Sequence, residues 1–219
     1  MKLAYALLPL AAATLGGCNI AAPIFYAIEG PPKTEAATTI NPDLKYVVVV
    51  DDLSNAMPSR ALRGELASKA EKTMLESGVA KVVLDHRAAM AVTSKERFGE
   101  QLSVVEVGQA VGADAVVHVV VEQFALSPDN TTYRPFAILR VKVVDVGQRK
   151  RVWPVGEKSD AGWPVNIGFK TQQGAPPQSL AETMKACDVL AGESGKAVAQ
   201  LFFTHENTQR AGASTKLTQ

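Results

Sequence analysis

The fold is decided by the stretch "LKYVVVVDD", residues 44–52. A continuous β-branched run of this length predicts a strand that is buried on both faces, which is typical of a parallel sheet. The segment after it predicts a helix, because Pro58 can open the helix and Gly78 can end it. Apolar residues recur there at every fourth position: Leu62, Leu66, Ala70 and Met74. The folded part of the chain therefore begins with a strand followed by a helix.

The alternation of strands and helices continues toward the middle of the chain. Residues 81–85, "KVVLD", predict a second strand, and a helical stretch follows at about residues 87–97. Ser103 and Glu106 have the spacing of a capping box, in which each side chain bonds the other residue's backbone N–H. A short helix is expected to begin there and to end at Gly112.

The second half of the chain predicts antiparallel strands. Residues 114–126 and 136–146 are long runs rich in valine, and the polar segment 127–135 between them suits a hairpin turn. Residues 147–155 add a turn and a short third strand that can continue the meander.

The last strong element is a helix at about residues 178–203, after a segment at 154–176 that is expected to be irregular. The complete order is β-α-β-α-β-β-β-α. This order predicts an α/β fold with one mixed β-sheet packed with helices.

Residues 190–197, "LAGESGKA", look like the middle of a phosphate-binding loop. Such a loop needs glycine at its first position and a hydroxyl residue after the lysine, but Leu190 and Ala197 stand at these positions. Apolar and small residues also recur through the segment at helical spacing. We therefore interpret it as part of the last helix and not as a nucleotide site.

The same helix carries several small residues. Ala191 and Ser194 are expected to let it approach the sheet closely, whereas Gly192 and Gly195 fall off the apolar seam and weaken the helix. Cys187 occupies an apolar position and is expected to be a small buried hydrophobe.

The amino-terminal 17 residues predict a signal peptide, with a positive charge at Lys2 before a short apolar run. The residues at the end of that run resemble the lipobox of bacterial lipoproteins: Leu15, Gly16, Gly17 and Cys18. The resemblance implies that Cys18 carries diacylglycerol and an acylated amino terminus, with chains such as palmitate. Asn19 follows, and by the enterobacterial sorting rule the outer membrane is favoured over the inner one. The alternative is an ordinary cleavage site without lipid.

The mature chain divides into three expected parts. Residues 18–43 are the lipidated cysteine and a proline-containing tether, residues 44–205 form the α/β domain, and residues 206–219 form a disordered tail. The chain has 23 basic and 22 acidic residues, and no basic stripe with interleaved aromatics. This balance argues against nucleic-acid binding.

Two segments resemble a group of bacterial envelope proteins that includes the amino-terminal domain of TolB, LpoB and CsgG. These segments are "VGADAVVHVVVEQF", residues 111–124, and "RVKVVDVGQRKRVWP", residues 140–154. The resemblance covers about residues 44–156 and implies an anticodon-binding-like α/β sandwich. It also implies a membrane-anchored lipoprotein, facing the periplasm, that binds other proteins.

Few residues suggest catalysis. Asp51 and Asp52 form a carboxylate pair at a strand end, which can hold a metal or act as acid and base, but turn and capping roles are commoner there. His86, His118 and His205 are not spaced as metal ligands, and His118 within a strand favours a structural hydrogen bond. We expect no cofactor, no catalytic or metal site, and no enzymatic activity.

The candidate partner-binding residues are four aromatic side chains in or beside loops: Trp153, Trp163, Phe169 and Tyr133. Long irregular segments in compact domains are often functional, so the loop 154–176 and the hairpin tip 127–135 are the expected binding surfaces. The alternative interpretation is that both tryptophan rings cap the sheet edge and pin the loop.

These features predict a non-catalytic, lipid-anchored adaptor of the cell envelope that binds an envelope protein. The alternative is an oligomeric component of a secretion or envelope-assembly system, similar to CsgG, in which copies of the chain associate. A membrane pore is disfavoured, because neither loop supplies the 9–11-residue alternating strands that cross a bilayer.

Overall fold

The computed structural model describes residues 33–94, 102–129, 131–156, 160–168 and 174–206. Two units are distinguished. In one, the short strands β1 (Lys33–Thr34) and β8 (His205–Glu206) pair in antiparallel register. The other, the main body, runs from Glu35 to Thr204 and contains the sheet and all four described helices.

One mixed sheet forms the centre of the main body. Its strands lie in this order across the sheet: β3 (Val82–Leu84), β2 (Lys45–Asp51), β4 (Ala115–Ala125) and β5 (Phe136–Asp145). Beyond β5 come β6 (Lys150–Trp153) and β7 (Trp163–Gly168), which pair with different halves of β5. β2 is parallel to both of its neighbours, and the strands from β4 onward are antiparallel. The prediction of a mixed α/β sheet is confirmed.

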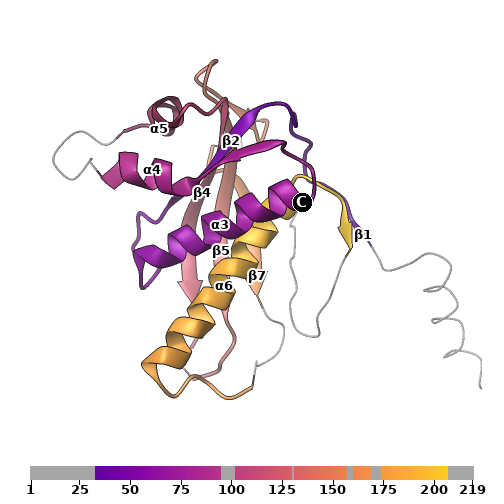
Figure 1. Ribbon diagram of the computed structural model, residues 1–219. Coiled ribbons are helices and arrows are strands. Elements are labelled where there is room, and N and C mark those ends of the chain that lie inside the picture. The colour runs from indigo at the N-terminus through magenta and orange to yellow at the C-terminus, as the bar shows by residue number, and fades with distance from the viewer. Residues whose placement is uncertain (1–32, 95–101, 130, 157–159, 169–173, 207–219) are drawn as a thin grey trace, which may run out of the picture. The chain divides into compact units, whose positions relative to one another are not determined.

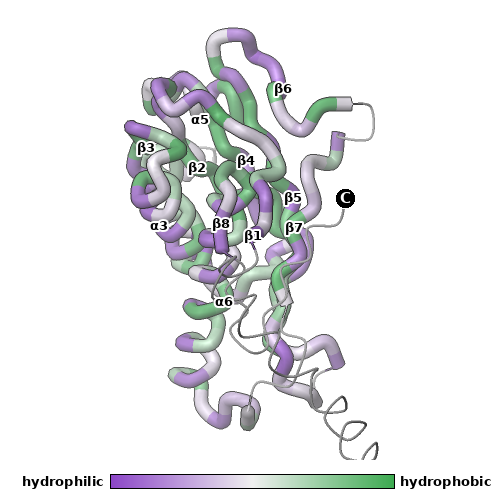
Figure 2. The backbone as a smooth tube through the Cα atoms, turned by 90° about the vertical axis from the view of Figure 1, so that its right-hand side faces the viewer, coloured by the Kyte–Doolittle hydropathy of each residue, from purple (hydrophilic) through white to green (hydrophobic). Residues whose placement is uncertain are grey.

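Helices cover both faces of the sheet (Figure 1). α3 (Arg60–Glu76) and α6 (Leu180–Gln200) pack on one face, whereas α4 (His86–Thr93) and α5 (Val104–Val111) pack on the other. Each face of the sheet has its own hydrophobic core. Alternate residues of β2 pack into one core or the other, because successive side chains of a strand point to opposite faces. Val48 belongs to the core under α3 and α6, and Val49 to the core under α4 and α5. Hydrophobic residues accordingly follow β4 and β5 through the body (Figure 2).

Side-chain caps fix where the helices begin. The capping box at Ser103 and Glu106 is present, and Gly112 ends α5 with a left-handed backbone at φ 74°. Ser59 and Asp85 cap α3 and α4, and the side chain of each accepts a hydrogen bond from the backbone N–H two residues further on. Each such cap stabilises a helix by about 1 kcal/mol, so these polar residues set the helix boundaries.

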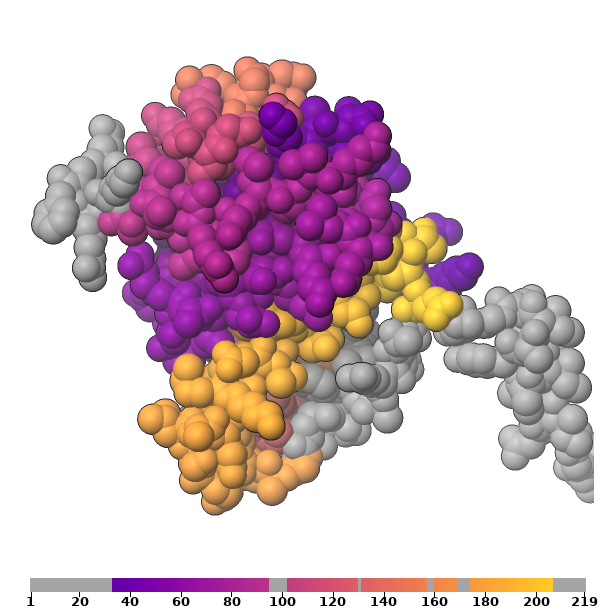
Figure 3. Space-filling view, viewed as in Figure 1, coloured from indigo at the N-terminus to yellow at the C-terminus, as the bar shows by residue number. Residues whose placement is uncertain are grey.

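α3 and α6 form adjacent bands on one face of the body (Figure 3). They approach closely at Gly195, where an added methyl group would overlap the Leu66 carbonyl oxygen and lie 3.0 Å from the Ala70 nitrogen. The expectation that Gly195 lies off the packed seam is therefore wrong, because its missing side chain is what allows the two helix backbones to meet. Gly192 has only Glu65 Oε1 near it, at 3.8 Å, and fits the expectation.

Two other sequence expectations differ from the structure. The segment 154–176 contains β7, in which Val165 and Ile167 are buried, although Pro164 and the flanking glycines hide this alternation in the sequence. Pro164 is tolerated because β7 is an edge strand, where a missing N–H costs no ladder bond on the open side. The packed body also begins before residue 44, since Ala37 and Ile40 contact the larger core.

Candidate functional site

A pocket of about 470 Å³ lies at the carboxyl end of β2, between α3 and α4. The connection from β2 to β3 runs through α3 on one face, and the connection from β3 to β4 runs through α4 and α5 on the other. β2 lies between β3 and β4, so its end is a topological switch point, the usual ligand site of open α/β sheets. This pocket is one of two candidate functional sites.

The carboxylate pair at the mouth of the pocket serves the local structure. Asp52 is 5% exposed and accepts hydrogen bonds from the backbone N–H groups of Ala56 and Met57, at 2.7 and 3.0 Å. Asp51 Oδ2 lies 2.7 Å from His118 Nε2 on β4. The turn interpretation is thus confirmed for Asp52, and His118 has the structural hydrogen bond that was expected. The partner of His118 was not foreseen, because the register of parallel strands is not visible in a sequence.

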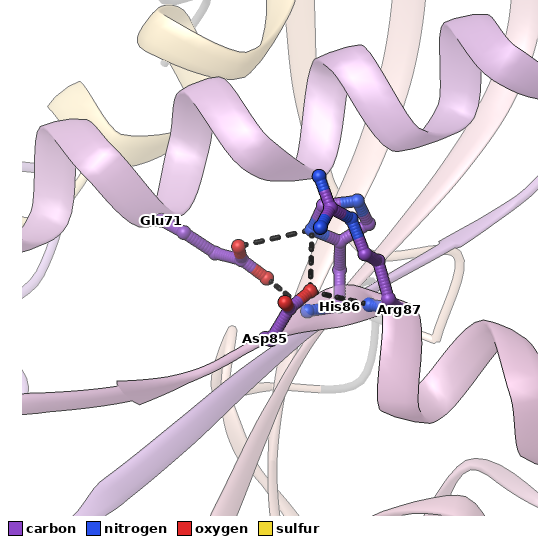
Figure 4. Close-up of polar contacts among 4 residues, drawn as sticks. All are labelled: Glu71, Asp85, His86 and Arg87. Carbon is purple, nitrogen blue, oxygen red and sulfur yellow. Dashed lines mark hydrogen bonds and ion pairs between the residues drawn. The ribbon is translucent and has the colours of Figure 1, made fainter.

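A second cluster joins α3 to the start of α4 (Figure 4). Glu71, Asp85 and His86 lie close enough together to hold a metal ion. Their ligand atoms already bond to the protein: Glu71 Oε1 accepts from the His86 backbone N–H at 2.7 Å, and Glu71 Oε2 lies 3.0 Å from His86 Nδ1. Asp85 Oδ1 accepts from the backbone N–H of Arg87 at 2.8 Å. We interpret this cluster as a structural junction.

The electrostatics of the junction agree with that interpretation. Burial raises the pKa of the Glu71 carboxyl, and the hydrogen bonds from His86 act in the opposite direction. His86 is only 7% exposed, and its ring lies near Gly64 of α3. The histidine therefore ties α4 to the middle of α3 by two contacts with one carboxylate.

The tryptophans predicted as partner anchors pack against each other instead of extending into solvent. The Trp153 and Trp163 ring centroids are 5.3 Å apart, and Trp153 also meets Phe202 edge-on at 6.1 Å. Trp153 is 8% exposed, and Trp163 is half-buried. These contacts agree with the alternative in which the rings cap the sheet edge and pin the loop. The partner-binding role of the four aromatic and loop residues stays a prediction, and Phe169 lies outside the described residues.

The two predicted binding surfaces meet in one shallow groove of about 520 Å³. The groove is lined by Tyr133 of the hairpin, by residues 175–178, and by residues of α6 that include Lys185 and Val189. The hairpin tip is held by Asp129, whose carboxylate accepts from the backbone N–H groups of Thr131 and Thr132. These two hydrogen bonds hold the pKa of Asp129 well below its usual range, and the bond from Thr132 has the larger effect.

"LAGESGKA" lies within α6, as its helical spacing predicted. Ser194 Oγ donates to the Leu190 carbonyl at 2.7 Å, and both residues are buried. Cys187 is also buried, and burial raises the pKa of its thiol, so it is the small hydrophobe that was expected. The lipobox residues, Leu15 to Cys18, lie outside the described residues.

No family model and no curated protein matches this chain. Solved structures do resemble it. A PelC dodecamer from Paraburkholderia phytofirmans is 12% identical, with 78% of this chain and 97% of that chain covered and a TM-score of 0.44. Lipoprotein GNA1162 from Neisseria meningitidis is 12% identical, with 67% and 94% covered and a TM-score of 0.40. Protein XCC0632 from Xanthomonas campestris is 10% identical, with 78% and 91% covered and a TM-score of 0.43.

These likenesses are too weak to assign a function to this chain. One of the three similar proteins is a bacterial lipoprotein. The expected resemblance to TolB, LpoB and CsgG stays a prediction. Among the helices of the described residues, none has the length and apolar character required to span a bilayer.

Proposed function

We propose that this protein is a lipid-anchored, periplasm-facing, non-catalytic adaptor of the bacterial cell envelope, with the outer membrane as its site. The observation that carries the binding part is the groove beside Tyr133, since it unites the hairpin, the end of the 154–176 segment and α6. The anchor rests on the lipobox residues that end at Cys18.

The groove fits an extended segment of another envelope protein. Tyr133, Pro177 and Val189 offer apolar contact, and Val189 is 55% exposed although it is hydrophobic. Glu182 is already occupied, because its Oε2 accepts from the backbone N–H of Gln178 at 2.7 Å. Within the described part of the chain, no carboxylate pairs with Lys185. The partner segment is therefore expected to present an apolar side chain followed by an acidic one.

Structural roles of the polar clusters support a non-catalytic protein. The His118 and His86 rings are each held by a carboxylate that ties two elements together. Asp52 accepts hydrogen bonds from two backbone N–H groups. Each of these side chains has a structural partner that accounts for its position without a catalytic role.

The position of the body supports action close to the membrane. About 17 residues separate Cys18 from Glu35, where the main body begins. A chain of that length spans at most about 60 Å when fully extended. A partner of the groove is thus expected at or near the same membrane.

The anchor is tested by metabolic labelling with radioactive palmitate in cells that express the full chain. Cys18→Ser is expected to abolish the label and to release the protein from the membrane fraction. Cys187→Ser is the matched control, because its thiol is buried in the body and its loss leaves the lipobox intact. Labelling that persists in Cys18→Ser overturns the anchor. The oligomeric secretion component stays the alternative.

A further inference from the structure

We propose that the pocket at the carboxyl end of β2 is a binding site for a phosphate group carried by a small organic molecule. This inference does not depend on the adaptor role or on the lipid anchor. It rests on the charges that line the pocket, on their partners, and on the place of the pocket in the fold.

Three arginines line this pocket from two sides. Arg60 and Arg63 are one turn apart on α3, and Arg87 is on the first turn of α4. Figure 4 shows Arg87 extending alongside the His86 ring toward α3. Residues three apart on a helix share a face, so the two arginines of α3 lie on the same side of the pocket.

Two carboxylates, Asp51 and Asp52, also line the pocket, so its three arginines leave a net positive charge, and neither carboxylate pairs with an arginine. Asp51 is paired with His118, and Asp52 is satisfied by backbone N–H groups. Across the described ranges, no carboxylate forms an ion pair with any of the three guanidinium groups. The pocket therefore has cationic donors in excess of its available acceptors.

Arg63 is the least exposed of the three arginines. Its Nε atom is buried and has no hydrogen-bond partner among the described residues. A buried donor without an acceptor costs about 1–3 kcal/mol, and more when it is charged, so folded proteins seldom leave one unused. A guanidinium presents a planar fork of donors that matches a phosphate or carboxylate group.

The ligand class follows from the rest of the lining. Three cationic groups suit a phosphate, which carries up to two negative charges, better than a single carboxylate. Much of the remaining wall is apolar, with Ala89, Met90 and Val107 among its residues, and Thr93 and Ser94 add hydroxyl groups. A volume of about 470 Å³ is within the range of roughly 300–1,000 Å³ that holds small ligands. A phosphate with a compact apolar portion fits this lining, whether it is a soluble phosphomonoester or a lipid headgroup.

The test uses the full mature protein, purified in detergent, with inorganic phosphate as the probe. Phosphate is added at constant ionic strength against chloride, and binding is measured as the rise in Tm and by calorimetry. Arg63→Met is expected to weaken binding by about tenfold or more, because a hydrogen bond to a charged group contributes about 1.5–3 kcal/mol. Arg134→Met is the matched control, since Arg134 is an exposed arginine of the hairpin, away from the pocket.

The phosphate site is overturned by some results of this test and supported by others. Equal Tm rises in the original protein, Arg63→Met and Arg134→Met, or no rise at all, overturn the site. If Arg63→Met does not fold, Arg87→Met makes the same test from an exposed position on α4. A second arm compares phosphatidylcholine vesicles with and without phosphatidylglycerol. Arg63-dependent binding to the anionic vesicles identifies a lipid source, whereas phosphate binding without vesicle binding identifies a soluble ligand, and both support the site.

Discussion

The close contact between α3 and α6 gives a sharp prediction for Gly195→Ala. The new methyl group would overlap the Leu66 carbonyl oxygen, whereas ordinary carbon–oxygen contacts are about 3.3–3.6 Å. The two helices must therefore move apart along an interface that is packed on the sheet. Overpacking of this kind costs about 1–3 kcal/mol of stability. Gly195→Ala is expected near the upper end of this range, because the atom in the way is a backbone oxygen, which cannot rotate aside as a side chain can. Alanine also favours the helix over glycine by about 1 kcal/mol, so the net loss in the free energy of unfolding is about 2 kcal/mol.

Gly192→Ala is the matched control on the same helix. Its methyl group would meet only Glu65 Oε1 at 3.8 Å, an ordinary contact, so the gain of about 0.8–1.0 kcal/mol in helix propensity is expected to remain. For a protein of this size, 1 kcal/mol shifts Tm by about 2–4 °C. Thermal unfolding, followed by circular dichroism, should show a Tm about 4–8 °C lower for Gly195→Ala and about 2–4 °C higher for Gly192→Ala than for the original protein. A Gly195→Ala protein at least as stable as the original refutes the close contact.

Two further predictions concern carboxylates that accept backbone hydrogen bonds. Asp52→Ala leaves the N–H groups of Ala56 and Met57 without their acceptor, and urea unfolding should show a loss of about 2–3 kcal/mol, with Asp52→Asn less affected. The hairpin should weaken in acid, because Asp129 is bonded as the carboxylate and its pKa is lower folded than unfolded. Its contribution is complete above the unfolded pKa of about 3.9 and is lost as pH falls through the folded pKa. The stability difference between the original protein and Asp129→Ala should shrink below about pH 4, and a constant difference would count against these bonds.

Most of the fold could be predicted from the sequence, because its elements have strong local signals. The valine run of β2 predicted a strand buried on both faces, and residues on opposite sides of it do belong to two different cores. The spacing of Ser103 and Glu106 predicted the start of α5, where both bonds of the capping box are present. Such signals depend on a few neighbouring residues and can therefore be recognised without knowledge of the tertiary structure.

β7 and the role of Gly195 were missed because their causes are not local. β7 exists through its pairing with β5, and its proline and glycines resemble those of a loop. Gly195 matters only because Leu66 and Ala70 of another helix face it.

The pocket was missed for the same reason. Arg60, Arg63 and Arg87 come from two helices that β3 separates in the chain, and no spacing rule joins them. The groove was predicted in part, since two of the three segments that form it were chosen as binding surfaces, but the contribution of α6 requires the fold.

The adaptor role is tested most directly by photocrosslinking in intact cells. A photoreactive amino acid at Val189 places the probe in the groove, and the same probe at Leu75, an exposed residue of α3, is the control. The account predicts one defined envelope protein, identified by mass spectrometry, that is captured from position 189 and not from position 75. That capture should be lost when Tyr133→Ala is combined with the probe. Capture of the same proteins from both positions, or capture that does not depend on Tyr133, would contradict the proposed function.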